Sequence, residues 1–339
     1  MADDGGSGEG NTVADDLGLW YLSDVTPIGR GGFAYVYAAT DTRFDRRVAV
    51  KVFQRMLTDD DRALFEIECR TTGRLSGVAN IITVHDVDYT ADGRPCIVMA
   101  HVAGGSLGDH LRRQGRIPWR RAVAWLVPLL RALDTAHGHG VLHRDIKPEN
   151  ILVDGDRVFL TDFGLATLKA GAAEADEAGV FASPLHAAPE TFAGATRDER
   201  SDVYSAASTL YNLIAGYAPF QGHGADLSPE AIVNRLRHEP PAHLPAELAP
   251  ADLDAVVQRA LAKDPARRPA SAAELADAIE AVLDAHSSPV PTPAHETEAE
   301  AAPAPAVPAP RAALTQTAPT PVPAADPPRR RFPWLRRFR

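Results

Sequence analysis

The sequence predicts an α+β fold with two lobes: a small, mainly antiparallel β lobe that contains one helix, followed by a larger, mainly helical lobe. Two observations lead to this prediction. Short runs rich in β-branched and aromatic residues follow one another from about Tyr21 to Ala100, and helical periodicity replaces them from Ser106 onward. The 339 residues are enough for one large two-lobed domain or two modest ones.

The β-rich part contains four predicted strands and one helix. The strands lie in FAYVYAA, RRVAVKVF, NIITVHDVDY and PCIVMAHV, and Asp92-Gly93 predicts a turn between the last two. The helix is expected to begin near Thr58, because the acids at positions 59, 60 and 61 suit a helix N-terminus. Its periodicity places four residues on one face, namely Leu64, Ile67, Thr71 and Leu75.

The second part contains a series of predicted helices. The stretch WRRAVAWLVPLLRALDTAHGHG is the first, and Pro128 is expected to kink it or to delay its start. Later helices are expected over residues 202–214, 228–238, 251–262 and 271–285. The apolar face of the first helix consists of Ala122, Val123, Leu126, Leu130 and Leu133.

The stretch IGRGGFAYVYAA, residues 28–39, predicts a loop that covers phosphate groups. Gly29 and Gly31 let the backbone approach phosphate oxygens where a Cβ would obstruct it. The stretch leads into a strand rather than a helix, which argues against a dinucleotide-binding turn, and the chain has no P-loop motif. Taken alone, the glycines also fit a plain β-hairpin turn.

Lys51 ends the apolar run VAVK. Burying the lysine ammonium group there costs desolvation free energy unless an anion pairs with it. The phosphates of ATP and Glu68, which lies on the following predicted helix, would supply that anion. The alternative is a surface lysine whose stem packs along apolar neighbours.

Four more motifs follow in order: HRDIKPEN at 143–150, DFG at 162–164, APE at 188–190 and SDVYS at 201–205. With the glycine loop and VAVK, they make the chain resemble the eukaryotic-type (Hanks-type) protein kinase family, specifically the bacterial serine/threonine-protein kinases. The resemblance implies the bilobal protein-kinase fold. It implies a kinase domain over residues 18–286, with an N-lobe of about 18–100 and a C-lobe of about 103–286.

The resemblance assigns catalytic roles to Asp145, Lys147, Lys51 and Glu68. Phosphoryl transfer depends on charge neutralisation and in-line positioning. Asp145 would accept or orient the proton of the substrate hydroxyl, and Lys147 would stabilise the transferring phosphate and mark serine/threonine specificity. The resemblance assigns Mg²⁺, with Mn²⁺ as a substitute, to oxygens of two further residues, Asn150 and Asp162.

The resemblance also implies a site for ATP between the lobes. Met99 would be the gatekeeper, and the backbones of Ala100 and Val102 would meet adenine. The full set of residues expected to bind ATP is Ile28, Gly29, Arg30, Gly31, Gly32, Phe33, Ala34, Tyr35, Val36, Ala49, Lys51, Met99, Ala100 and Val102.

Supporting residues are implied in the same way. His143 and Phe163 would pack between the lobes, Asp202 would brace the catalytic loop, and Glu190 would pair with Arg268. The chain departs from the family pattern at four positions: Ala34, His186, Ala206 and Ala207.

The implied activity is transfer of the γ-phosphate of Mg·ATP to serine and threonine hydroxyls of proteins, with autophosphorylation, in bacterial signal transduction. One alternative is a scaffold on an inactive kinase fold, but the lysine, base and metal-binding residues are all present. Another is a small-molecule phosphotransferase, but APE and the Ser183-Pro184 loop favour a protein substrate.

The segment from Asp162 to Glu190 has no hydroxyl residue between Leu168 and Ala182. Phosphates on such segments pair with an arginine beside the catalytic aspartate, here Arg144. We hypothesise that an acid in this segment partly replaces the phosphate; the alternatives are a solvated acidic loop and control through Ser183, Thr167 or dimer contact. The candidate acids are Glu174, Asp176 and Glu177.

Both ends of the chain are expected to be disordered: residues 1–17 are acidic and glycine-rich, and residues 287–339 are rich in proline and alanine. No signal peptide or membrane span is predicted, so a cytoplasmic location is expected. Cys69 and Cys96 fit neither a disulfide nor a metal framework, and both are interpreted as reduced and structural. The net charge of −10 argues against nucleic-acid binding.

The C-terminal tail suggests further partners. Its proline-spaced threonines are candidate autophosphorylation sites for phosphothreonine-reading proteins, or else part of an inert linker. The basic, aromatic residues 329–339 suit peripheral contact with an anionic membrane, or else form a solvated or protein-binding end. A homodimer is a further expectation. The threonines are Thr292, Thr297, Thr315, Thr317 and Thr320.

Overall fold

The computed structural model describes residues 17–163, 184–193, 197–222 and 226–287, apart from the side chains of residues 59–61, 64 and 68. The chain divides into two units, Met1–Ser288 and Pro289–Arg339, and all described residues belong to the first. The acidic N-terminus, most of the segment between DFG and APE, and the threonine-rich basic tail lie outside the described residues, so the predictions made for them stay predictions.

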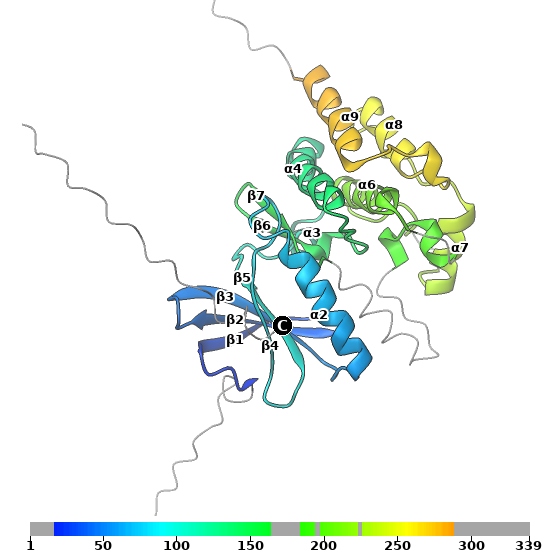
Figure 1. Ribbon diagram of the computed structural model, residues 1–339. Coiled ribbons are helices and arrows are strands. Elements are labelled where there is room, and N and C mark those ends of the chain that lie inside the picture. The colour runs from blue at the N-terminus through cyan, green and yellow to red at the C-terminus, as the bar shows by residue number, and fades with distance from the viewer. Residues whose placement is uncertain (1–16, 164–183, 194–196, 223–225, 288–339) are drawn as a thin grey trace, which may run out of the picture. The chain divides into compact units, whose positions relative to one another are not determined.

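The β lobe is a five-stranded antiparallel sheet in the order β1-β2-β3-β5-β4 (Figure 1). β3 is central, with β2 on one side and β5 on the other. The four predicted strands are confirmed as β2 to β5, whereas β1, which precedes the glycine loop, was not predicted. The bounds are β1 Leu22–Arg30, β2 Ala34–Asp41, β3 Arg46–Phe53, β4 Val84–Tyr89 and β5 Pro95–Ala100.

The helix described in this lobe, α2 (Asp59–Gly73), begins at the acids that predicted its N-terminus, but Ile67, one of the four residues predicted to share an apolar face, does not face the core. Ile67 is 55% exposed, whereas Phe65 is fully buried. The Phe65 ring packs edge-on against Phe53, with 5.7 Å between ring centroids, and so takes the inward position. Leu75 is buried but lies beyond the end of the helix. The smaller aliphatic Ile67 is turned to solvent because the aromatic side chain fills the space above the sheet.

The second lobe is helical, with one small hairpin, β6–β7 (Figure 1). The predicted apolar face of α4 is confirmed, since all five of its residues are buried. Pro128 does not delay the start of α4, because the helix begins at Trp119 and continues through the proline. The bounds are α3 Leu107–Gln114, α4 Trp119–Gly138, β6 Ile151–Asp154, β7 Arg157–Leu160, α6 Glu199–Ala215, α7 Pro229–His238, α8 Ala251–Ala260 and α9 Ala272–Ala285.

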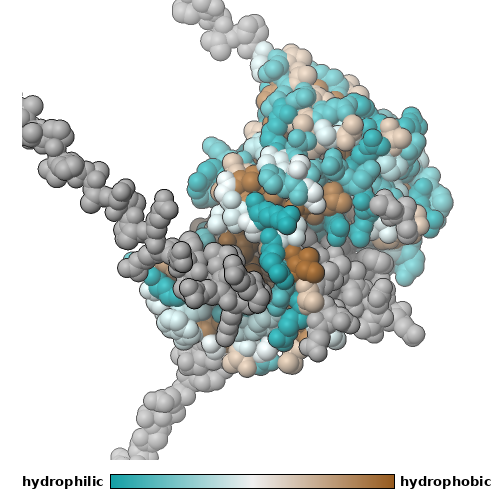
Figure 2. Space-filling view, viewed as in Figure 1, coloured by the Kyte–Doolittle hydropathy of each residue, from teal (hydrophilic) through white to brown (hydrophobic). Residues whose placement is uncertain are grey.

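Helix α6 is the centre of this lobe, because almost all of its side chains are buried. Asp198 caps it by accepting a hydrogen bond from the backbone N–H of Arg200, and Gly216 ends it with φ of 88°, which favours glycine. The buried core packs α6 among α4, α8 and α9. Apolar residues on the visible face are scattered among hydrophilic ones, as expected for a folded surface (Figure 2).

Candidate active site

The glycine loop is the turn between β1 and β2. The backbone N–H of Gly31 donates to the carbonyl of Ala34 over 2.9 Å, and the Gln54 side chain donates to the carbonyl of Gly31 over 2.9 Å. Ala34, where the family has a third glycine, is a buried residue of β2 that pairs with Phe53 in β3. The alanine methyl therefore packs into the sheet and leaves the exposed tip of the loop unchanged.

Lys51 projects from the central strand β3, where its register partners are Val36 on β2 and Ile97 on β5. Its ammonium group lies 2.5 Å from Oδ2 of Asp162, and the two side chains are 11% and 12% exposed. This pair joins the β lobe to the DFG motif, although 111 residues separate the two positions. Glu68 lies on α2, but its side chain is outside the described residues, so its pairing with Lys51 stays a prediction.

Asp145, Lys147 and Asn150 come together within the catalytic loop. Nζ of Lys147 donates to both carboxylate oxygens of Asp145, over 2.9 and 3.1 Å. The amide nitrogen of Asn150 donates to the backbone carbonyl and the carboxylate of Asp145, over 2.7 and 3.0 Å. The short 3₁₀ turn Pro148–Asn150 returns the chain so that Asn150 reaches Asp145. The Asp145 carboxylate is thus held from two sides.

The backbone of this loop is fixed by Asp202 from the first turn of α6. Its carboxylate accepts hydrogen bonds from the backbone N–H groups of His143 and Arg144, over 2.8 and 2.7 Å, and from Nε2 of His137 over 2.9 Å. Arg144 has φ of 67°, an unfavourable conformation for this residue that these bonds stabilise. Burial opposes ionisation of Asp202, but the His137 and backbone hydrogen bonds outweigh it and hold its pKa below the usual value.

His143 and Phe163 stack as the resemblance implied, with ring centroids 4.5 Å apart. His143 is fully buried, its pKa is lowered chiefly by burial, and its Nε2 lies 2.9 Å from the carbonyl of Thr161. Because a carbonyl only accepts, the neutral ring donates from Nε2. This bond ties the catalytic loop to the residue just before Asp162.

Glu190 and Arg268 form the predicted pair, which is bidentate with distances of 2.7 and 2.8 Å. The Arg268 side chain is fully buried, and its guanidinium also donates to the backbone carbonyls of Arg200 and Lys263. Ser201 donates to the same carboxylate over 2.7 Å. Burial opposes ionisation of Glu190, but Arg268 and Ser201 hold its pKa below the usual value.

His186, which replaces a family tyrosine, anchors the turn Pro184–His186 to α6. Its Nδ1 lies 2.9 Å from the hydroxyl of Ser208. Burial, and then the nearby charge of Lys147, lower its pKa to about 4, so the ring is neutral near pH 7. The sequence identified His186 only as a position where this chain differs from the kinase family pattern. Its partner Ser208 could not be identified from the sequence, because it lies 22 residues away on another element.

Five of the residues predicted to bind ATP share one apolar cluster, namely Val36, Ala49, Met99, Ala100 and Val102. Ile28 on β1, from the same predicted set, is 52% exposed and lies outside this cluster. Ala49 on β3 lies opposite Met99 on β5, and Val36 and Val102 pack with them. Leu152, on β6 of the helical lobe, belongs to the same cluster and was not predicted. A periodicity argument could not find it, because the contact depends on how the hairpin packs under the sheet.

The charged part of the site suits a divalent cation bound together with phosphates. Mg²⁺ takes one or two side-chain oxygens and completes its shell with phosphate and water oxygens. Asp162, whose carboxylate contacts the Lys51 ammonium, and Asn150, whose backbone carbonyl accepts from the N–H of Thr161, could supply such oxygens. Within the described part of the chain there is no cluster of three or more histidine, cysteine or acidic side chains able to hold a metal alone.

Comparison with known proteins agrees with this geometry. The protein kinase domain model matches residues 22–279. PknK of Mycobacterium bovis, a serine/threonine-protein kinase, is 40% identical over 262 residues, which are 77% of this chain and 23% of PknK. PknL of Mycobacterium tuberculosis, also a serine/threonine-protein kinase, is 36% identical over 263 residues, 76% of this chain and 64% of PknL. The chain thus spans less than two thirds of the length of these relatives.

Solved structures of protein kinases are also similar to this chain. The crystal structure of the Mycobacterium tuberculosis PknI kinase domain has a TM-score of 0.59 and 31% identity, and the match covers 77% of this chain and 96% of that domain. Among the helices that are described here, none has the length and apolar composition needed to cross a membrane. The chain belongs to the protein kinase family and has the bilobal fold of the bacterial serine/threonine-protein kinases.

Proposed function

We propose that this chain is a serine/threonine protein kinase that transfers the γ-phosphate of Mg·ATP to protein hydroxyls. The observation that carries the proposal is that the Lys51–Asp162 pair and the Asp145–Lys147–Asn150 cluster lie on neighbouring backbone segments, since the N–H of Thr161, next to Asp162, donates to the carbonyl of Asn150 over 3.0 Å. These groups supply the positive charge, the oxygen ligands and the carboxylate base that phosphoryl transfer requires.

In the proposed reaction, the substrate hydroxyl oxygen attacks the γ-phosphorus while the bond to the β-phosphate oxygen breaks. The carboxylate of Asp145 orients the hydroxyl and accepts its proton. Lys147 neutralises charge on the moving phosphoryl group, and Lys51, supported by Glu68, positions the remaining phosphates. Asp162 and Asn150 would hold Mg²⁺, or Mn²⁺ as a substitute, and the bound cation would supply positive charge that neutralises the phosphates.

A single comparison tests this proposal. The full chain and its Asp145→Asn variant are incubated with radiolabelled ATP, MgCl₂ and a generic basic protein substrate. The proposal expects phosphoserine or phosphothreonine from the wild type and a loss of about 100-fold or more in the variant. ATP binding without transfer would instead indicate a scaffold, and transfer to a sugar or antibiotic alone would indicate a small-molecule phosphotransferase.

We also propose that the acidic segment sets basal activity. Glu174, Asp176 or Glu177 would pair with Arg144, so the enzyme would not need a phosphate there, although one carboxylate charge is weaker than a phosphate. Replacing all three acids with Gln or Asn should lower peptide phosphorylation severalfold. Unchanged activity, or a wild type that is inactive until Ser183 or Thr167 is phosphorylated, would contradict the proposal.

The tail supports proposals that concern partners rather than chemistry. Autophosphorylated threonines in residues 287–339 would bind phosphothreonine-reading proteins, and residues 329–339 would bind an anionic membrane surface. Sedimentation with phosphatidylserine vesicles, comparing the full chain with a variant that lacks residues 327–339, tests the second. Equal sedimentation of both proteins would contradict it. A role in bacterial signalling, a cytoplasmic location and a homodimer stay predictions.

A further inference from the structure

The glycine loop is held by a residue for which the sequence predicted no role, Gln54. This residue is exposed and directly follows Phe53, the last residue of β3. Its backbone N–H donates to the carbonyl of Phe33, and its side-chain amide donates to the carbonyl of Gly31, each over 2.9 Å. The main chain and the side chain of Gln54 therefore both bond to the loop between β1 and β2.

The tip of this loop has few other restraints among the described residues. Gly31 and Gly32 are exposed, and no heavy atom lies within 4 Å of the position that a Cβ of Gly32 would occupy. The loop backbone adds one bond of its own, from the N–H of Gly31 to the carbonyl of Ala34 over 2.9 Å. Because glycine has more backbone freedom than other residues, the bond from the Gln54 side chain contributes much of the order at the tip.

The bond to Gln54 fixes the orientation of the peptide group between Gly31 and Gly32. A trans peptide group is planar, and its C=O and N–H point in opposite directions. When the carbonyl of Gly31 accepts from the Gln54 amide, the N–H of Gly32 must point away from that amide. Without this bond, the two glycines allow the peptide group to rotate. Gln54 therefore decides which way the N–H of Gly32 faces.

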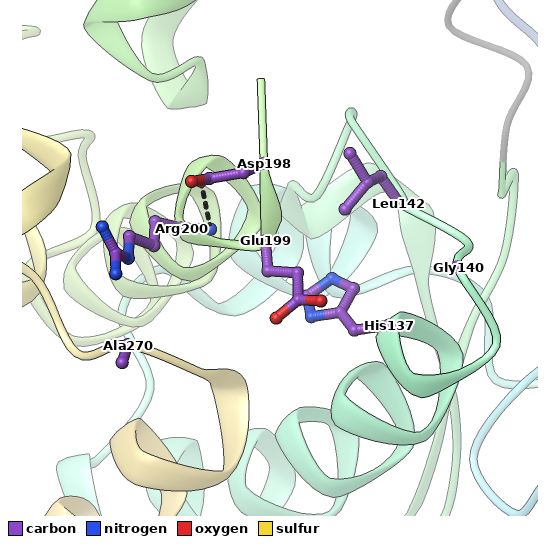
Figure 3. Close-up of a pocket in the computed structure, with 7 residues that line it drawn as sticks. All are labelled: His137, Gly140, Leu142, Asp198, Glu199, Arg200 and Ala270. Carbon is purple, nitrogen blue, oxygen red and sulfur yellow. Dashed lines mark hydrogen bonds between the residues drawn. The ribbon is translucent and has the colours of Figure 1, made fainter. Parts of the chain in front are cut away.

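The backbone N–H groups of Gly32 and Phe33 have no acceptor within the described part of the chain. The start of α6 shows the usual alternative, since there the side chain of Asp198 accepts from the backbone N–H of Arg200 over 2.9 Å (Figure 3). Successive N–H groups of a turn that lack such an acceptor can bind an anion. The loop thus presents two successive donors to a ligand.

Gln54 also connects these donors to the charged part of the site. Lys51 lies three residues before Gln54, on the same strand β3. In the register of β2 with β3, Lys51 pairs with Val36 and Phe53 pairs with Ala34. The strand that carries the Lys51 ammonium therefore continues directly into the residue that holds the loop.

We propose that Gln54 is a positioning residue for nucleotide phosphates: its side-chain amide holds the Gly31 carbonyl so that the N–H groups of Gly32 and Phe33 meet a phosphate oxygen. Gln54 acts through the loop and does not contact the ligand. The inference rests on the proposed function, because it takes Mg·ATP as the ligand. Gln54 should therefore affect the binding of phosphates, but neither the binding of adenine nor the acceptance of a proton by Asp145.

The test compares the full chain with its Gln54→Met variant, which keeps the side-chain length but has no amide donor. Calorimetry measures the binding of adenosine and of the β,γ-imido analogue of ATP with Mg²⁺. The variant should bind the analogue about three- to tenfold more weakly and adenosine within about twofold of the wild type. In peptide phosphorylation, KM for ATP should rise by the same factor while kcat stays within about twofold. Unchanged analogue binding, an equal loss for adenosine, or a fall in kcat alone would overturn the proposal.

Gln258→Met is the matched control. Gln258 on α8 also donates from its side-chain amide to a backbone carbonyl, that of Ala242, over 2.8 Å. This control should leave the binding of both ligands within about twofold, and a loss equal to that of Gln54→Met would overturn the proposal. Gln54→Glu keeps the size of the side chain, but its carboxylate cannot donate and repels phosphate. It should weaken analogue binding at least as much as Gln54→Met, and wild-type affinity in this variant would also contradict the role of Gln54.

Hydrogen exchange in the ligand-free protein separates this proposal from the proposed function. NMR of the full chain labelled with ¹⁵N-glycine reports on Gly31, whose N–H closes the loop, and on Gly115, whose N–H donates to the carbonyl of Leu111 over 2.8 Å. Gln54→Met should speed exchange at Gly31 by about threefold or more and leave Gly115 unchanged. Equal exchange at Gly31 in the two proteins would overturn the role of Gln54. If the wild type transfers no phosphate, the proposed function fails, while exchange and analogue binding still decide the role of Gln54.

Discussion

Two buried ion pairs of this molecule have similar lengths but different surroundings. Lys51 and Asp162 meet between the β lobe and the DFG motif at 2.5 Å, with both side chains about one-tenth exposed. Glu190 and Arg268 meet inside the helical lobe in a bidentate pair, with the Arg268 side chain fully buried and bonded also to three backbone carbonyls, those of Arg200, Ala262 and Lys263. The second pair has nearly all of its hydrogen-bonding capacity used by the protein itself.

This difference separates a pair that acts on substrate from a pair that maintains the fold. A ligand with phosphates and a metal ion can compete for Lys51 and Asp162, because both reach the site where such a ligand would bind. Nothing comparable can replace Glu190 for Arg268, since the surrounding carbonyls and Ser201 enclose the pair. We therefore expect loss of the first pair to reduce catalysis and loss of the second to reduce stability.

The largest expected effect is on stability. Arg268→Met leaves the Glu190 carboxylate buried without its cation, which should lower the free energy of unfolding by about 3 to 5 kcal/mol. Urea unfolding followed by circular dichroism measures the change. The double variant Glu190→Leu Arg268→Met removes both charges and should recover about half of the loss; no recovery would show that packing, rather than the unpaired charge, dominates.

Lys51→Met tests the other pair. It should lower kcat/KM for peptide phosphorylation by about 100- to 1000-fold, because the phosphates lose their cation, while the free energy of unfolding changes by less than about 1 kcal/mol. The matched control is Lys263→Met, since Lys263 is a half-buried lysine that donates to the carbonyl of Leu236. The control should keep kcat/KM within about threefold. A Lys51 variant that unfolds would contradict the distinction between the two pairs.

His186 provides a buried polar group that is neutral, for comparison with both charged pairs. Its pKa is lowered from 6.5 to about 4 in the folded protein, so the unfolded chain binds more protons between these values. Stability is therefore complete above about pH 6.5 and falls as the pH decreases, by about 2 kcal/mol between pH 7 and pH 5. Urea unfolding at several pH values should show a shallower slope for His186→Gln, and an unchanged slope would assign the effect to other groups.

The smallest effect is expected at an exposed pair of similar length. Arg157 and Asp154 lie 2.6 Å apart on the β6–β7 hairpin, with side chains 72% and 48% exposed. Arg157→Gln should cost at most about 0.5 kcal/mol, and the cost should vanish in 0.5 M NaCl because exposed charges are screened. A loss close to that of Arg268→Met would show that distance, rather than burial, sets the energy of these pairs.

The sequence by itself determined the order of the elements and the identity of the chemical groups. Strand and helix periods predicted β2 to β5 and the long helices, and the HRD, DFG and APE motifs predicted which side chains carry the charge. Local patterns suffice for this, because backbone preferences and side-chain periods act over a few residues.

Tertiary structure alone decided which groups meet. Phe65 rather than Ile67 faces the sheet because an aromatic ring fills the space between Phe53 and Tyr89. Ser208 completes the bond to His186, Leu152 joins the apolar cluster of the predicted ATP site, and His137 on α4 bonds to Asp202 on α6. These contacts join positions far apart in the chain, so they depend on packing and burial that no local pattern encodes.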